Sequence, residues 1–138
     1  MIRDEKVYKL LSKPRKIRRE INRVNGEIEA LIQSYALPKA ITYDKDPVQT
    51  SPEDPMLKYM AEKERLEKKR DKLLIKYVEA QRDISIKLDA VPELGALIIT
   101  RRFLENLSFA DIIAEVGLSE RQMYRYYNEA LEELAKNI

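Results

Sequence analysis

Residues 119–128 carry polar side chains of the types that read duplex DNA. An arginine can donate two hydrogen bonds to guanine in the major groove, and a glutamine can pair in a similar way with adenine. We therefore expect Arg121, Gln122 and Arg125 to contact bases. The candidate DNA-binding set is completed by a helix-capping serine, Ser119, and by three side chains suited to phosphate oxygens, Ser108, Tyr124 and Asn128.

The helices that must position these side chains are predicted within residues 92–138. Ser108 is expected to cap a helix that begins at Phe109. Gly117 is expected to turn the chain in a left-handed conformation, which glycine adopts at low cost, and Ser119 to cap a second helix. Two helices joined by a tight glycine turn form a helix-turn-helix. The inward positions of the second helix are expected to be Met123, Tyr126, Ala130, Leu131 and Leu134.

A third helix is predicted just before this pair, in the segment PELGALIITRRFLE at residues 92–105. Asn106 follows it, and asparagine can replace glycine in a left-handed helix cap. The three helices would share one apolar core. Residues 92–138 are therefore expected to form the DNA-binding domain.

Two long charged helices are predicted ahead of this domain. Pro14 suits the first turn of a helix, so one helix is expected over about residues 14–35, with a short helix from Asp4 to Leu11 as a candidate ahead of it. A second, uninterrupted helix is expected over about residues 55–90. Residues 36–54 contain three prolines and are predicted to form the connecting loop. The sequence thus predicts an all-α fold, in which residues 1–91 form a helical hairpin for oligomerisation or partner binding.

The apolar stripe of the second long helix is longer than its predicted partner. Residues 57–91 carry apolar side chains at heptad-like spacing, whereas the first helix is expected to cover only about residues 15–35. An amphipathic helix must bury its apolar stripe. We therefore expect a homodimer through the long helices, which the substitution Ile84→Asp would dissociate.

The chain of 138 residues contains neither cysteine nor histidine. This composition rules out disulfides, Cys/His zinc sites, thiol nucleophiles and histidine-based triads. The three glycines are too far apart for a phosphate-binding loop, and no apolar run approaches the ~18 residues of a membrane span. We expect no enzyme activity, no metal, no cofactor and no membrane partner, and the absence of cysteine favours the cytoplasm.

Residues 98–134 contain a set of residues at characteristic positions, namely Arg102, Phe103, Leu107, Ser108, Asp111, Ile112, Gly117, Leu118, Ser119, Met123, Ala130, Leu131 and Leu134. In this pattern the segment resembles region 4 of bacterial sigma factors. Ile113 and Arg101 depart from that pattern, because a small residue and an apolar residue are usual at their positions. The whole chain is also similar to small phage proteins of the ArpU and RinA late-gene regulator type, which join a charged coiled segment and a long helix to such a domain.

This resemblance implies a transcriptional regulator that activates phage or prophage genes in the cytoplasm of a bacterial host. Its partners would be double-stranded DNA, a second copy of the chain and, as a further candidate, RNA polymerase. Two alternatives stay open. One is a small terminase-like DNA-packaging subunit, which also joins a helix-turn-helix to coiled segments, and the other is a protein-interaction module that no longer binds DNA.

The charge of the predicted DNA-binding domain is unfavourable for binding a polyanion. From Glu93 onward the chain has five basic and eight acidic residues, whereas a DNA-contacting face is usually basic. Two basic clusters, at residues 13–23 and 63–72, are candidates for additional DNA contacts. A solvated helix face is the plainer interpretation of both clusters.

Overall fold

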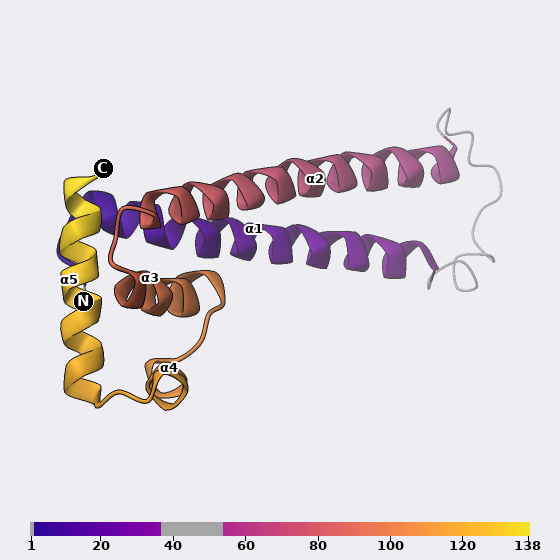
Figure 1. Ribbon diagram of the computed structural model, residues 1–138. Coiled ribbons are helices and arrows are strands. Elements are labelled where there is room, and N and C mark those ends of the chain that lie inside the picture. The colour runs from indigo at the N-terminus through magenta and orange to yellow at the C-terminus, as the bar shows by residue number, and fades with distance from the viewer. Residues whose placement is uncertain (1, 37–53) are drawn as a thin grey trace. The chain divides into compact units, whose positions relative to one another are not determined.

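The structure, a computed structural model, describes residues 2–36 and 54–138. Over these residues it contains helices and turns without a strand, which confirms the predicted all-α fold. Most of the predicted loop at residues 36–54 lies outside the described part of the chain. The elements in chain order are α1 (Glu5–Ala36), α2 (Pro55–Leu88), α3 (Glu93–Ile99), the π-helical turn η2 (Thr100–Leu104), α4 (Phe109–Val116) and α5 (Glu120–Lys136) (Figure 1).

The short helix expected from Asp4 to Leu11 and the helix expected from Pro14 are one continuous helix, α1, which begins at Glu5. The carboxylate of Asp4 accepts hydrogen bonds from the backbone N–H groups of Lys6 at 2.9 Å and Val7 at 3.1 Å, which caps the helix at Glu5. Pro14 lies inside the helix, where it is buried. A proline costs one backbone hydrogen bond at an internal position. Burial of the apolar face on both sides of Pro14 offsets this cost, so the helix continues through it.

Helix α2 begins as the sequence predicts. Asp54 accepts a hydrogen bond from the backbone N–H of Met56 at 2.9 Å, and Pro55 occupies the first helical position. The helix then runs without interruption to Leu88, close to the predicted end.

The chain forms two compact units. One consists of residues 1–17 together with 76–138, and the other of residues 18–75. Each unit contains parts of both long helices, so this division does not coincide with a boundary at residue 91. The helix-turn-helix segment belongs to the first unit.

The unit of residues 18–75 is a pair of helices packed side by side (Figure 1). The rings of Tyr35 on α1 and Tyr59 on α2 stack with centroids 4.2 Å apart, and the Tyr35 hydroxyl lies 3.3 Å from the sulfur of Met56. Stacking of this kind adds about 0.5–1.5 kcal/mol beyond the burial of the rings. The buried apolar side chains of this unit are Ile21, Val24, Ile28, Leu66 and Leu73.

The other unit has one apolar core shared by five elements. The start of α1 contributes Val7 and Leu11, and the end of α2 contributes Ile84 and Leu88. The remaining buried core side chains of this unit follow α2, and they are Val91, Ile98, Ile99, Ile112, Met123, Tyr127, Ala130 and Leu134.

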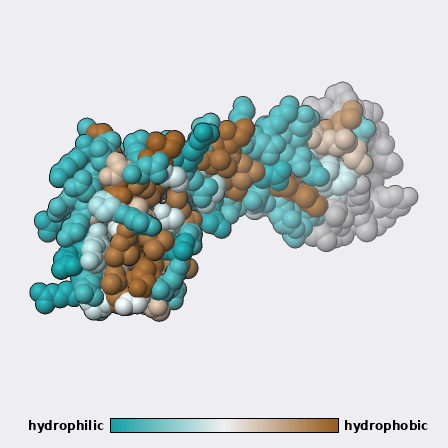
Figure 2. All heavy atoms as spheres, viewed as in Figure 1, coloured by the Kyte–Doolittle hydropathy of each residue, from teal (hydrophilic) through white to brown (hydrophobic). Residues whose placement is uncertain are grey.

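The expectation that Ile84 forms a dimer contact is wrong. Its side chain is 0% exposed in the single chain, in a core with Val7 and Leu11, because α1 starts early enough to cover it. In Figure 2, hydrophobic atoms appear among the hydrophilic ones along the long helices. The uncovered apolar side chains of α2 lie mainly on the side of the helix away from its buried stripe. They are Met56, Leu57, Met60, Leu74, Ile75, Val78 and Ile86.

Among the helices of the described residues, none has the length and apolar character that crossing a membrane requires.

Candidate nucleic-acid interface

The turn between α4 and α5 has the local geometry that the sequence predicts. Ser108 accepts a hydrogen bond from the backbone N–H of Asp111 at 3.1 Å and caps α4. Gly117 ends α4 with a φ of 70°, in the left-handed region. Ser119 caps α5 by accepting from the backbone N–H of Gln122 at 3.2 Å. The three residues between the helices thus form a tight, capped turn.

Gln122 has a structural contact that the sequence analysis did not assign to it. Its side-chain oxygen accepts a hydrogen bond from the backbone N–H of Ser119 at 3.3 Å, which completes a reciprocal capping box. A Ser-x-x-Gln spacing at a helix start is the known signature of this motif, so the contact was readable from the sequence. In this arrangement the oxygen of Gln122 is occupied by the cap, while the side chain remains exposed.

The helix-turn-helix is held by aromatic contacts around Phe109. Its ring lies 5.2 Å from that of Tyr127 in an edge-to-face arrangement and 5.3 Å from that of Tyr124. Of the adjacent residues Tyr126 and Tyr127 on α5, Tyr127 is buried. Tyr126, which was expected to face inward, is only half-buried. Burial raises the pKa of Tyr127 above its ordinary value.

Helix α5 crosses α3 at a contact between two small residues. A Cβ atom added at Gly95 would lie 2.6 Å from the Cβ of Ala130 and 3.2 Å from the backbone oxygen of Tyr126. The two helices therefore approach closely only because position 95 has no side chain. Ile113 on α4 is half-buried.

Arg101 joins the first helix of the domain to α4. Its guanidinium donates a 2.8 Å hydrogen bond to Glu115 and forms a second ion pair with Glu105. These carboxylates raise the pKa of Arg101. Its charge is thus neutralised within the domain, which explains how an arginine is accommodated where an apolar residue was expected. Arg102 donates to the backbone oxygen of Leu107 at 3.1 Å.

The exposed side of α5 is basic in its first half. Arg121, Arg125 and Asn128 are exposed and, at 3.6 residues per turn, they line up on the side opposite the buried Met123 and Ala130. The guanidinium of Arg125 lies over the ring of Tyr126, 5.1 Å from its centroid. No ion pair involves Arg121 or Arg125 within the described residues. Their charges are therefore available to an external anion.

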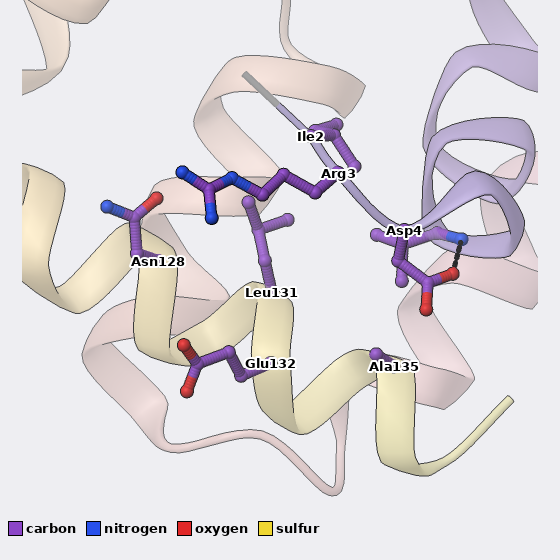
Figure 3. A pocket seen from close by; sticks show the side chains of 8 residues that line it. Ile2, Arg3, Asp4, Asn128, Leu131, Glu132 and Ala135 are labelled. Atoms are coloured by element: carbon purple, nitrogen blue, oxygen red, sulfur yellow. Dashed lines mark hydrogen bonds between the residues drawn. The ribbon is translucent and has the colours of Figure 1, made fainter.

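The second half of the same side faces a pocket next to the start of the chain. The pocket has a volume of about 670 Å³, and in Figure 3 the Arg3 side chain extends along α5 towards Asn128. The sequence did not indicate this placement, because it arises from packing between the two ends of the chain. The pocket is lined by Ile2, Arg3, Asp4, Val7, Asn128, Leu131, Glu132 and Ala135.

The structure brings the seven candidate residues to one helix-turn-helix, in different roles. Ser108 and Ser119 are helix caps, and Tyr124 is half-buried against Phe109. Both serines are exposed. Arg121 and Arg125 are the candidates with a formal charge. Among the described residues, no group of acidic side chains is arranged to hold a metal ion.

Comparisons of this chain with protein-family models, with curated proteins and with solved structures find no match.

Proposed function

We propose that the protein binds duplex DNA in a sequence-dependent manner and regulates transcription of phage or prophage genes. The observation that carries this proposal is the capped α4–α5 pair, whose second helix presents Arg121 and Arg125 on its exposed first half. In a helix-turn-helix, the N-terminal residues of the second helix contact base edges in the major groove. The resemblance of residues 98–134 to sigma region 4 supports the same assignment.

In this proposal the two arginines have the main recognition role. Each can donate a bidentate pair of hydrogen bonds to guanine, or a single contact to a phosphate. The hydroxyls of Ser108 and Tyr124 and the amide of Asn128 would contact the sugar-phosphate backbone. A second copy of the chain would bind the other half of a palindromic site, and RNA polymerase would be the downstream partner.

The test begins with selection of the duplexes that the protein retains from a random pool. Arg121→Ala and Arg125→Ala are each expected to weaken binding of the selected site by about 1–3 kcal/mol, and at least one should relax the preference at one base position. Lys136→Ala is the matched control, because Lys136 lies in the last turn of α5 and already pairs with Glu133. It should leave affinity nearly unchanged.

The outcomes separate the alternatives. Unchanged binding by the Arg121→Ala/Arg125→Ala double variant would rule out α5 as the reading helix. A parent protein that retains no duplex would favour the protein-interaction module, for which the excess of acidic residues after Glu93 is the supporting observation. Rings of about eight or more subunits, measured by native mass spectrometry, would instead favour the DNA-packaging subunit.

A further inference from the structure

The residues 13–23 of α1 form a strongly basic surface. This stretch of eleven residues contains six basic side chains and one acidic side chain, which gives a net charge of +5. The stretch of equal length at residues 62–72 on α2 also contains six basic side chains, but its four acidic ones reduce the net charge to +2. The two clusters have the same number of lysine and arginine residues, and they differ in the number of acidic side chains among them.

The α2 cluster is partly neutralised by its own helix. Ion pairs join Arg65 to Glu62 and Lys68 to Glu64, the latter at 3.1 Å between Nζ and Oε1. Arg70 pairs with its neighbour Asp71 at 3.6 Å. Pairs of this kind along one helix are the ordinary pattern of a solvated surface.

The α1 cluster has no such neutralisation. Within the described residues, none of its six basic side chains takes part in an ion pair. Lys16 instead lies over the ring of Tyr8, with its Nζ 5.5 Å from the centroid. Unpaired like charges on one helix repel each other and destabilise it slightly. An external polyanion would relieve this repulsion.

Three of these arginines form a row. Arg15, Arg19 and Arg23 are spaced by four residues and are exposed, so they follow one another along one side of α1 at intervals of about 6 Å. The side chain of Ile17 lies on the other side of the helix and is buried. A row of bidentate donors along one side of a helix suits a linear array of phosphates better than it suits a single small anion.

The helix-turn-helix itself has few unpaired basic side chains that could contact phosphates. Of the five basic residues after Glu93, Arg101 and Lys136 are already paired with carboxylates. Contacts from arginine and lysine to phosphates provide most of the salt-dependent affinity of DNA-binding proteins. Arg121 and Arg125 alone supply few of them.

We propose that the row Arg15, Arg19 and Arg23, flanked by Lys16, binds the phosphate backbone of duplex DNA. This inference rests on the proposed function, because it assigns a second contact surface for the same ligand. The row adds affinity without reading bases, so its contribution is the same for every sequence.

The test compares two variants that each lose three positive charges. R15Q/R19Q/R23Q removes the row, and K63Q/K69Q/K72Q removes three α2 lysines that form no ion pair within the described residues. Affinity for the selected duplex and for a scrambled duplex is measured over a series of salt concentrations, and circular dichroism checks that both variants remain helical. Each lost phosphate contact lowers the slope of log affinity against log salt by about 0.9.

For R15Q/R19Q/R23Q we expect the slope to fall by about two to three for both duplexes, with the preference for the selected site unchanged. The α2 variant should change the slope by less than about one. Equal salt-dependence slopes for the two triple variants would overturn the inference. If the Arg121→Ala/Arg125→Ala variant still lost the preference for the selected duplex, the proposed function would stand without the row. A parent that binds both duplexes equally, with binding lost in R15Q/R19Q/R23Q, would support the row and contradict sequence-specific reading. A parent that binds neither duplex would overturn both proposals.

Discussion

Two residues in the left-handed conformation end helical segments within residues 92–138. Asn106 has a φ of 59° after η2, and Gly117 has a φ of 70° after α4. The left-handed region is strained for residues with a Cβ atom, and β-branched residues are the least tolerated there. Asparagine is a partial exception, because its short polar side chain can bond to the local backbone. The two positions therefore differ in the residues that they tolerate, although their backbone angles are alike.

Gly117→Val is expected to lower the free energy of unfolding by more than about 1 kcal/mol, because a β-branched residue is strained at this φ. No other atom lies within 4 Å of a Cβ added at Gly117, so backbone conformation and not crowding is the cause. Gly117→Asn is the matched control, and its free energy of unfolding should fall by less than that of the Val variant. Urea denaturation followed by circular dichroism measures both, and equal stability of the Val variant and the parent would refute this account of the turn.

At this scale the sequence predicts features that arise within a few residues. The serine caps, the glycine turn and the left-handed Asn106 are confirmed because each depends on its own backbone neighbours. Tyr126 and Tyr127 are adjacent on α5, so a small rotation of the helix decides which of them is buried. Packing against Phe109 selects Tyr127, and no local pattern contains that information.

At the scale of helices, the crossing of α3 and α5 is the tightest packing that the structure describes at a glycine. Both Gly95 and Ala130 are buried. The sequence did not indicate their contact, because 35 residues separate them. The same kind of distant packing explains α1, whose early start at Glu5 depends on a core built with the end of α2. Helix identities were thus predictable, whereas their crossings and one of their ends were not.

Gly95→Ala is expected to destabilise the protein by about 1–3 kcal/mol, although alanine is the better helix former. The added methyl group would lie 2.6 Å from the Cβ of Ala130, so α3 and α5 must move apart. Gly26→Ala is the matched control on α1. It adds the same methyl group with no atom within 4 Å and should stabilise the protein by about 0.5–1 kcal/mol.

Thermal unfolding of the two variants gives the comparison. Opposite shifts of the midpoint are expected, downward for Gly95→Ala and upward for Gly26→Ala. An upward shift in both would show that the close crossing of α3 and α5 does not constrain position 95.

At the scale of the whole molecule, self-association would use a different face of α2 from the one expected. The stripe that contains Ile84 is covered by α1 within a single chain. Val78 and Ile86 are 60% and 58% exposed on another side of the same helix. Exposed apolar side chains that recur along one side of a long helix favour contact with another apolar surface. The proposed homodimer would therefore bury this uncovered side.

The variant V78D/I86D is expected to be a folded monomer, whereas Ile84→Asp is expected to unfold the unit of residues 1–17 and 76–138. The difference follows from burial, since an aspartate at position 84 would place an unpaired charge in the core. Light scattering at tens of micromolar measures the assembly state, and circular dichroism measures folding. A parent protein that is monomeric under these conditions would exclude the dimer.

The division of the chain into two units also sets an order of events during protein synthesis. Residues 18–75 leave the ribosome as one contiguous segment, so their helical pair can form as soon as it emerges. The unit that carries α5 is made from residues 1–17 and 76–138. At about 5–20 residues per second, residues 76–138 take roughly 3–13 s to translate, and Val7 and Leu11 lack part of their core until then. The core that holds α5 is therefore completed after the helical pair has been made, so the two units can fold one after the other.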